Sequence, residues 1–176
     1  MMVVIETARV RLRHLLADRH DAAAMLELLN EPAFHQYIGD RGVRTEEQAC
    51  DYIRNGPLLS YAQHGFGMYA IERRSDGAWL GNAGLVRRDG LPSADLGYAL
   101  LQRHAGQGYA REAAHAVLDY ARRTLGLGAL CAIVAPGNLR SVALLQALGF
   151  HGDGTLRLPG KDEELLLFIN TPAEAL

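Results

Sequence analysis

Residues 102–110 read Gln-Arg-His-Ala-Gly-Gln-Gly-Tyr-Ala, a glycine-rich turn that joins an extended segment, residues 95–101, to a long amphipathic one. The first four backbone N–H groups of a helix lack intrahelical acceptors, and the helix dipole is positive there, so an anion gains several hydrogen bonds at once. Gly106 and Gly108 allow positive φ and keep side chains out of a ligand's path. The stretch therefore predicts a phosphate-binding turn at a helix start.

Two better-known phosphate motifs do not fit this turn. A dinucleotide fingerprint requires a third small residue where this chain has Arg111, and an acidic residue about twenty positions further on, where residues 125–131 contain none. A nucleotide P-loop requires Gly-Lys-Ser/Thr, and the single lysine of the chain is Lys161. Neither kind of nucleotide site is predicted.

The pattern that remains, Arg103-x-x-Gly106-x-Gly108 followed by Ala110, resembles the acyl-CoA pyrophosphate motif of the GNAT superfamily of N-acetyltransferases. Asn138-Leu-Arg-Ser141, with Leu-Gly-Phe at 148–150, is similar to the second half of that family's cofactor site.

Other segments extend the resemblance over nearly the whole chain. Residues 7–13 resemble the opening strand of the family. Residues 95–98 and 152–157 are similar to its Rim-type branch, which contains ribosomal-protein N-terminal acetyltransferases. Residues 17–65 match only as a coarse pattern.

The resemblance implies acetyl-CoA as the acyl donor. The pantetheine arm would pair with the strand before the turn like an added β-strand, and the pyrophosphate would face backbone N–H groups of the turn. Asn138 would hydrogen-bond the pantetheine or the loop, and it can also cap the following helix. The cofactor-binding residues implied are Tyr98, Ala99, Leu100, Arg103, His104, Gly106, Gln107, Gly108, Tyr109, Ala110, Asn138 and Ser141.

Several of these neighbours have two interpretations. Gly97 could mark a bulge that separates its strand from the next one, or be a glycine tolerated at a crowded crossing. His104 could contact the ligand or simply be exposed. Arg111 and Arg140 could reach phosphates, although arginines are common on helix surfaces.

Ser141 is the first candidate catalytic residue. In Rim-type relatives the matching serine contacts the cofactor sulfur and is a candidate proton donor to the thiolate, whereas a serine early in a helix is ordinarily a cap. Many other family members place a tyrosine four residues later, where this chain has Leu145. The usual tyrosine acid is therefore absent.

No general base is evident, because Ile133 and Gly160 stand where relatives place carboxylates. Asp95 is the candidate we select; Asp153 and residues 162–164 remain alternatives, and each could equally be a strand-end or turn residue. An α-amine is about one-tenth neutral at pH 7, whereas a lysine amine is neutral about once in 2,500, a penalty of about 4.6 kcal/mol. A site without a strong base therefore favours an N-terminal α-amine.

Composition limits the remaining possibilities. The 176 residues, 49% of them hydrophobic, suit a single domain spanning residues 1–176. A formal charge of −2 argues against nucleic-acid binding. Cys50 and Cys131 have no metal-ligand spacing, so we expect no metal and a reduced, cytoplasmic protein. No apolar run approaches membrane-spanning length.

Periodicity predicts an α/β (α+β) domain with a mixed, mainly antiparallel twisted sheet of about seven strands and about four helices. A helix capped by Asp18 or Asp21 ends at residues 30–32, and a capping box at Thr45 starts another that stops at residues 55–57. The segment between them is expected to be irregular. The other helices are expected at 110–125 and 138–148, and the strands at 9–15, 66–72, 79–87, 93–101, 129–135, 154–158 and 164–170.

The resemblance implies an acetyl-CoA-dependent N-acetyltransferase acting on a primary amine, most favourably a peptide or protein N-terminus. A small-molecule amine, such as an antibiotic or a polyamine, is the alternative acceptor. Because the tyrosine and the carboxylates are missing, a non-catalytic acyl-CoA-binding module is the alternative class. The expected partners are acetyl-CoA and an amine, with no nucleic acid and no membrane, in a monomer or homodimer.

Overall fold

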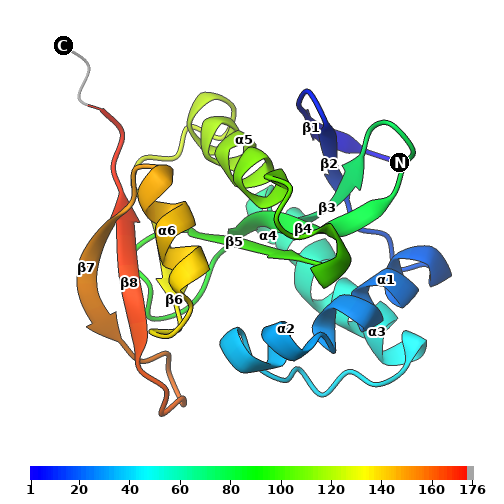
Figure 1. The fold of residues 1–176 in the computed structure, drawn as a ribbon, viewed down its shortest axis with the longest axis horizontal. Helices are drawn as coiled ribbons and strands as arrows, with labels where there is room; N and C mark the ends of the chain where they lie inside the picture. Colours follow the sequence, from blue (N-terminus) through cyan, green and yellow to red (C-terminus); the bar gives the residue numbers. More distant parts are fainter. Residues whose placement is uncertain (174–176) are drawn as a thin grey trace.

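The computed structural model describes residues 1–173, which form one sheet with helices on both faces (Figure 1). The strands are β1 (Val3–Glu6), β2 (Val10–His14), β3 (Met68–Arg73), β4 (Trp79–Val86), β5 (Asp95–Leu100), β6 (Leu130–Val134), β7 (His151–Leu156) and β8 (Leu165–Asn170). The α-helices are α1 (Arg19–Leu29), α2 (Pro32–Tyr37), α3 (Glu46–Ile53), α4 (Leu59–His64), α5 (Tyr109–Arg123) and α6 (Leu139–Ala147). The predicted fold class is confirmed, with eight strands where the sequence indicates about seven.

The strand order is β1-β2-β3-β4-β5-β6-β8-β7, and β5 and β6 form the one parallel pair among the described strands. Their register contains a single partnered pair, Asp95 with Cys131, beside the hydrogen bond of 3.0 Å that Cys131 N–H donates to Ala94 O. Beyond that point the two strands are no longer paired. The edge of β5 that faces β6 is therefore left without a strand partner.

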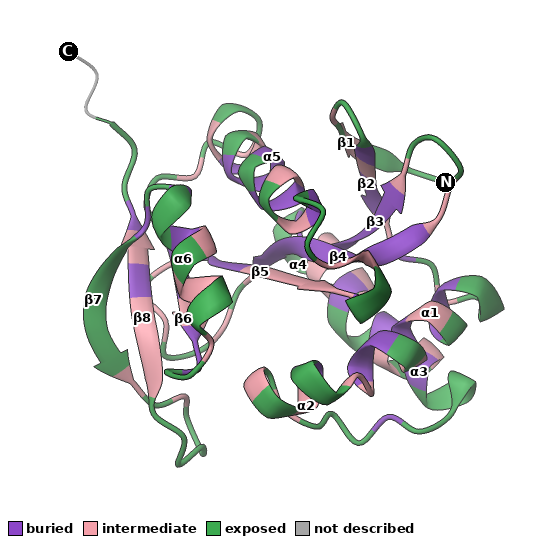
Figure 2. Ribbon diagram, in the orientation of Figure 1, coloured by how far each residue is buried: buried purple, intermediate pink, exposed green. Residues whose placement is uncertain are grey.

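Two apolar layers cover the sheet. One face carries α5 and α6, and the other carries α1 and α3; in Figure 2 the buried residues follow the central strands and the inner sides of these helices. Short side chains on α5 let the helix approach the sheet closely. The buried residues of α5 are Tyr109, Ala113, Ala114, Ala116, Val117, Leu118 and Ala121.

A buried ion cluster fixes α1 to the sheet. Arg13, which is 2% exposed, donates through Nη1 and Nη2 to the carboxylate of Asp21 at 2.8 and 2.7 Å, and through Nε to Glu72 Oε1 at 2.6 Å. Leu16 N–H donates to the same Asp21 carboxylate at 2.7 Å. Since each charge has a partner, the cluster determines where α1 sits.

The capping residues and the closing glycine read from the sequence predict the starts of α1 and α3 and the end of α5 correctly. Asp18 accepts from Asp21 N–H at 2.9 Å at the start of α1, and Thr45 accepts from Gln48 N–H at 3.1 Å at the start of α3. The glycine predicted to close α5, Gly126, has φ +66°.

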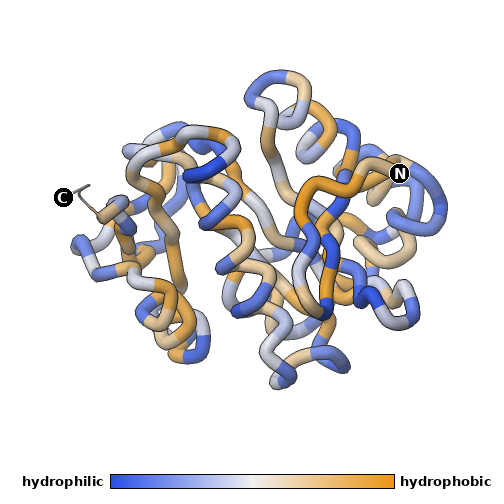
Figure 3. Tube along the Cα trace, turned by 90° about the horizontal axis from the view of Figure 1, so that it is seen from above, coloured by the Kyte–Doolittle hydropathy of each residue, from blue (hydrophilic) through white to orange (hydrophobic). Residues whose placement is uncertain are grey.

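Two expectations about residues 1–65 were wrong, and one strand was not predicted. The apolar start of the chain, orange beside the N-terminus in Figure 3, is the edge strand β1, because β2 supplies a partner through pairs such as Ile5 with Leu12. The segment expected to be irregular contains α2, which begins with Pro32 in the first turn, where proline is tolerated. Pro57 does not stop the helix, because a π-helical turn (Arg54–Leu58) carries the chain into α4.

Candidate active site

The glycine-rich turn has the geometry that its sequence predicts. Gly106 has φ +77° and Gly108 has φ +83°, both left-handed, and Gly108 is the N-cap of α5. No side chain caps this helix start, and no atom lies within 4 Å of the position that a Cβ on Gly106 would occupy. The first N–H groups of α5 are therefore available to a ligand, beside open space.

Arg9 braces the turn from the start of β2, a role that the sequence did not reveal. Its Nη1 donates to Gln107 O at 2.9 Å and its Nε donates to Glu112 Oε2 at 2.7 Å. The guanidinium also lies 4.6 Å from the ring centroid of Tyr109, a cation–π contact. The turn is thus held from outside, which leaves its N–H groups free.

A cleft of about 1370 Å³ follows the gap between β5 and β6 and reaches the turn. Arg111 and Arg140 line it as well. The predicted cofactor-binding residues that line the cleft are Tyr98, Ala99, Leu100, Gly106, Gly108, Tyr109, Ala110, Asn138 and Ser141.

Three predicted cofactor residues do not belong to that lining. Arg103 forms an ion pair with Glu27 of α1, so its side chain anchors the turn to the opposite layer. His104 lies in a short 3₁₀ turn (Gln102–His104), where burial and the neighbouring Arg103 lower its pKa. Gln107 is exposed, and its carbonyl is the acceptor used by Arg9.

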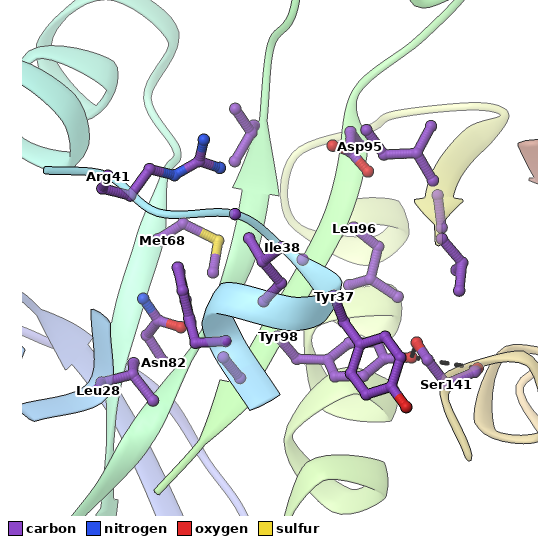
Figure 4. A pocket seen from close by; sticks show the side chains of 18 of the residues that line it. Leu28, Tyr37, Ile38, Arg41, Met68, Asn82, Asp95, Leu96, Tyr98 and Ser141 are labelled. Carbon is purple, nitrogen blue, oxygen red and sulfur yellow. Dashed lines mark hydrogen bonds between the residues drawn. The ribbon is translucent and has the colours of Figure 1, made fainter. Parts of the chain in front are cut away.

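A pair of hydroxyl groups lies on the cleft wall, joined by a dashed line in Figure 4. Tyr98 Oη and Ser141 Oγ are 2.6 Å apart, and either can donate. Ser141 N–H donates to Asn138 Oδ1 at 3.3 Å, so the N-cap that the sequence suggested is formed. Burial raises the pKa of Tyr98, opposed by its bond with Ser141. The resemblance pointed to the backbone of Tyr98, and its hydroxyl was missed.

Asp95 lies where β5 and β6 begin to separate, and it is 3% exposed. Arg88 Nε donates to its Oδ2 at 2.8 Å, and the backbone of Ile133 also hydrogen-bonds its carboxylate. Burial raises the pKa of Asp95 to about 6, against the opposing effect of Arg88. This carboxylate is therefore ionised at pH 7 but close to its protonated form. Asp153, the other single aspartate considered, lies on the exposed strand β7.

The opposite wall of the cleft comes from α1, α2 and the segment after them. Leu28, Ile38 and Arg41 lie on this wall, with Tyr37 in front of the hydroxyl pair in the view of Figure 4. Three of the five acidic side chains on the cleft are ion-paired, namely Asp40 with Arg44, Asp51 with Arg54 and Asp95 with Arg88. Of the other two, Glu31 accepts from Gln102 N–H at 3.1 Å, and Glu163 is exposed.

Gly97 does not mark a bulge. The pairing of β4 with β5 runs through Gly84 and Gly97 without a shift in register. A Cβ on Gly97 would lie 3.2 Å from Met68 Sδ, tighter than ordinary contact. Gly97 therefore lies at a crowded crossing, where the end of the Met68 side chain would have to shift to admit a Cβ. The separation of β5 from β6 arises without a bulge in the pairing of β4 with β5.

No group of three or more His, Cys, Asp or Glu side chains within residues 1–173 could hold a metal ion. No helix in the same range is long and apolar enough to cross a bilayer.

The site defines this chain as an α/β protein in which an uncapped helix start, able to bind an anion, lies beside a strand edge that is free to accept an extended ligand. Residues 9–151 match the family described as the acetyltransferase (GNAT) domain, and the chain belongs to this family. It is an N-acetyltransferase.

Curated relatives agree over most of the chain. YjcK of Bacillus subtilis, named as a probable N-acetyltransferase, is 33% identical over 168 residues, covering 91% of this chain and 87% of that protein. YkkB of the same organism is 31% identical over 153 residues, covering 86% and 87%. An acetyltransferase structure from Agrobacterium tumefaciens has a TM-score of 0.80 at 26% identity, covering 98% of this chain and 95% of the other.

More distant structures share the fold alone. A ribosomal-protein-S5-alanine acetyltransferase from Vibrio fischeri has a TM-score of 0.72 at 18% identity, covering 99% of this chain and 98% of the other. A spermidine N-acetyltransferase chimera from Vibrio cholerae has a TM-score of 0.74 at 20% identity, covering 93% and 96%. Because one name specifies a protein and the other a polyamine, the shared fold does not identify the acceptor of this chain.

Proposed function

We propose that this protein transfers the acetyl group of acetyl-CoA directly to the N-terminal α-amine of a peptide or protein. The observation that carries the proposal is the single cleft that joins the uncapped start of α5, the unpaired edge of β5 and the Tyr98–Ser141 hydroxyl pair. A long ligand with phosphates at one end and a reactive group at the other suits this arrangement.

The cofactor would lie along β5. Its pyrophosphate would accept hydrogen bonds from N–H groups at residues 106–110, where the left-handed glycines leave room. Its pantetheine amides would pair with the backbone of residues 98–100, as an added strand does. Arg111 and Arg140 line the same cleft and would supply positive charge toward the phosphates.

Positioning supplies most of the acceleration, and the side chains handle two protons. The amine nitrogen attacks the thioester carbonyl carbon, a C–N bond forms and the C–S bond breaks. Ser141 gives the thiolate a proton and can recover one from Tyr98 across their 2.6 Å contact, and Tyr98 then regains a proton from water in the cleft. The proton lost by the amine passes to Asp95. Because Asp95 lies three residues, about 10 Å along the strand, from Tyr98 and the reacting group beside it, water must relay this proton.

An α-amine fits this proton chemistry better than a lysine or a polyamine does. Asp95, with a pKa of about 6, is a weak base, and it suffices for an amine that is already partly neutral at pH 7. A polyamine would need a strongly acidic cleft. Three of the five acidic residues on this cleft are ion-paired, and the lining also carries basic residues outside those pairs, namely Arg41, Arg87, Arg111, Arg140 and Lys161. A small amine therefore remains the second candidate acceptor.

The test is the release of CoA from acetyl-CoA in the presence of different amines. The protein should release CoA well above background with peptides that have free N-termini. It should not do so with the same peptides blocked at the N-terminus, with Nα-acetyl-lysine or with spermidine. Acetyl-CoA binding is measured separately by calorimetry. Binding without release for any amine would establish the non-catalytic module instead, and release with spermidine alone would establish the small-molecule alternative.

A further inference from the structure

The floor of the cleft contains one polar side chain among small and apolar neighbours. Strand register places Ala70, Asn82 and Ala99 in one row across β3, β4 and β5, and Met68, Gly84 and Gly97 in the next. Asn82 is 7% exposed, and its Oδ1 is buried without a hydrogen-bond partner. A buried carbonyl oxygen left unpaired costs free energy, so this amide calls for an explanation.

The surroundings of Asn82 are apolar. Leu28 of α1, Ile38 after α2 and Met68 of β3 line the same cleft, and Figure 4 shows Met68 and Leu28 on either side of Asn82 in that view. None of these three side chains can donate a hydrogen bond to the amide oxygen of Asn82. Pockets for small groups commonly have apolar walls and a few polar groups that fix orientation.

We infer that Asn82 positions the acceptor amine, by accepting a hydrogen bond from its N–H beside an apolar pocket for the first side chain of the substrate. The inference rests on the proposed function and deepens it, because it specifies the acceptor as an α-amine on a residue with an apolar side chain. The neighbours of Asn82 in its row are alanines, whose side chains offer no hydrogen bond, so Oδ1 would reach the amine by a turn of the amide toward the cleft.

An amide suits this task because it carries no charge. A carboxylate at the same place would stabilise the ammonium form, raise the pKa of the amine and reduce the fraction able to attack the thioester. A neutral acceptor orients the nitrogen without favouring its protonation. Asn82 is therefore a positioning residue and takes no proton in the reaction.

Three variants test the inference. Asn82→Ala should raise KM for the acceptor about tenfold, the effect of one lost hydrogen bond, with little change in kcat and none in acetyl-CoA affinity. Its thermal midpoint should stay equal or rise, since an unpaired buried group is removed. Asn82→Asp should move the pH profile of kcat/KM to higher pH. Asn55→Ala, at an exposed position on the rim of the same cleft, is the matched control and should change none of these.

The outcomes separate this inference from the proposed function. If the wild-type protein acetylates no peptide, the proposed function fails first. If the wild type is active but Asn82→Ala keeps its acceptor KM, or Asn82→Asp keeps the wild-type pH profile, the role of Asn82 is refuted. Peptides that begin with leucine should be preferred over those that begin with glutamate, and equal kcat/KM for the two would overturn the apolar pocket.

Discussion

Replacing Asp95 by asparagine should stabilise the fold at pH 8 and weaken catalysis at pH 7. Burial raises the pKa of Asp95 from 3.8 to about 6, so the fold prefers the protonated carboxyl. That preference stabilises the protein fully below pH 3.8 and is lost as the pH rises through about 6. Two pKa units correspond to about 3 kcal/mol. Asparagine imitates the protonated form, so Asp95→Asn should recover on the order of 3 kcal/mol at pH 8.

Urea denaturation at pH 4, 6 and 8 measures this effect. The variant should match the wild type near pH 4 and exceed it increasingly toward pH 8, with a flatter dependence of unfolding free energy on pH. Asp153→Asn, at an exposed position on β7, is the control and should follow the wild type. Lower stability of Asp95→Asn at pH 8 would refute the reasoning, because it would mean that the ion pair with Arg88 outweighs the cost of burial.

The same substitution should also slow acetyl transfer. Asp95→Asn should release CoA about tenfold more slowly at pH 7 when the acceptor is a peptide with a free N-terminus. Without the carboxylate, only the fraction of the α-amine that is already neutral in solvent, about one-tenth, can react. The deficit should shrink by pH 9, where the amine is neutral without help. A deficit that stays constant across this range would remove Asp95 from proton transfer.

Three further changes follow from the structure. Ser141→Ala should lower kcat about a hundredfold. Acetyl-CoA affinity should change little, because the backbone N–H of residue 141 still donates to Asn138 Oδ1 at the start of α6. Unchanged steady-state turnover would exclude Ser141 as the proton donor. Gly106→Ala should weaken acetyl-CoA binding about tenfold in calorimetry, since the left-handed conformation of the turn costs an alanine about 1–2 kcal/mol. The control Gly128→Ala, at a position without positive φ, should keep the wild-type affinity. Equal acetyl-CoA affinities of the two variants would contradict the role of the turn. Arg13→Ala should lower the unfolding free energy by about 3–5 kcal/mol in urea, because the buried Asp21 loses its ion-pair partner and Glu72 keeps only Arg11. A loss below about 1 kcal/mol would contradict that view of the cluster.

Features controlled by neighbouring residues could be predicted from the sequence. The glycine-rich turn, the apolar stripe of α5 and the cap by Asn138 depend on groups within a few positions, and each has the expected geometry. The resemblance singled out Ser141, and Asp95 is selected from the acidic residues because the relatives' carboxylates are absent. Both residues line one cleft, and their roles remain predictions.

Features that depend on distant partners were missed for a physical reason. β1 becomes a strand because β2 offers it an edge, and Pro57 continues a helix because a π-helical turn accommodates the missing N–H. The brace from Arg9 and the Tyr98 hydroxyl contact span 98 and 43 residues of sequence, respectively. The unpaired amide of Asn82 becomes visible only when the register of three strands is known.

The central claim is transfer of an acetyl group to an α-amine, and tandem mass spectrometry of one peptide tests it most directly. The peptide carries a free N-terminal leucine and an internal lysine, and it is incubated with the protein and acetyl-CoA. The account predicts the added acetyl group on the N-terminal residue alone, and about a hundredth as much of this product when Ser141→Ala replaces the wild type over the same time. An acetyl group on the lysine with the N-terminus unmodified would contradict it.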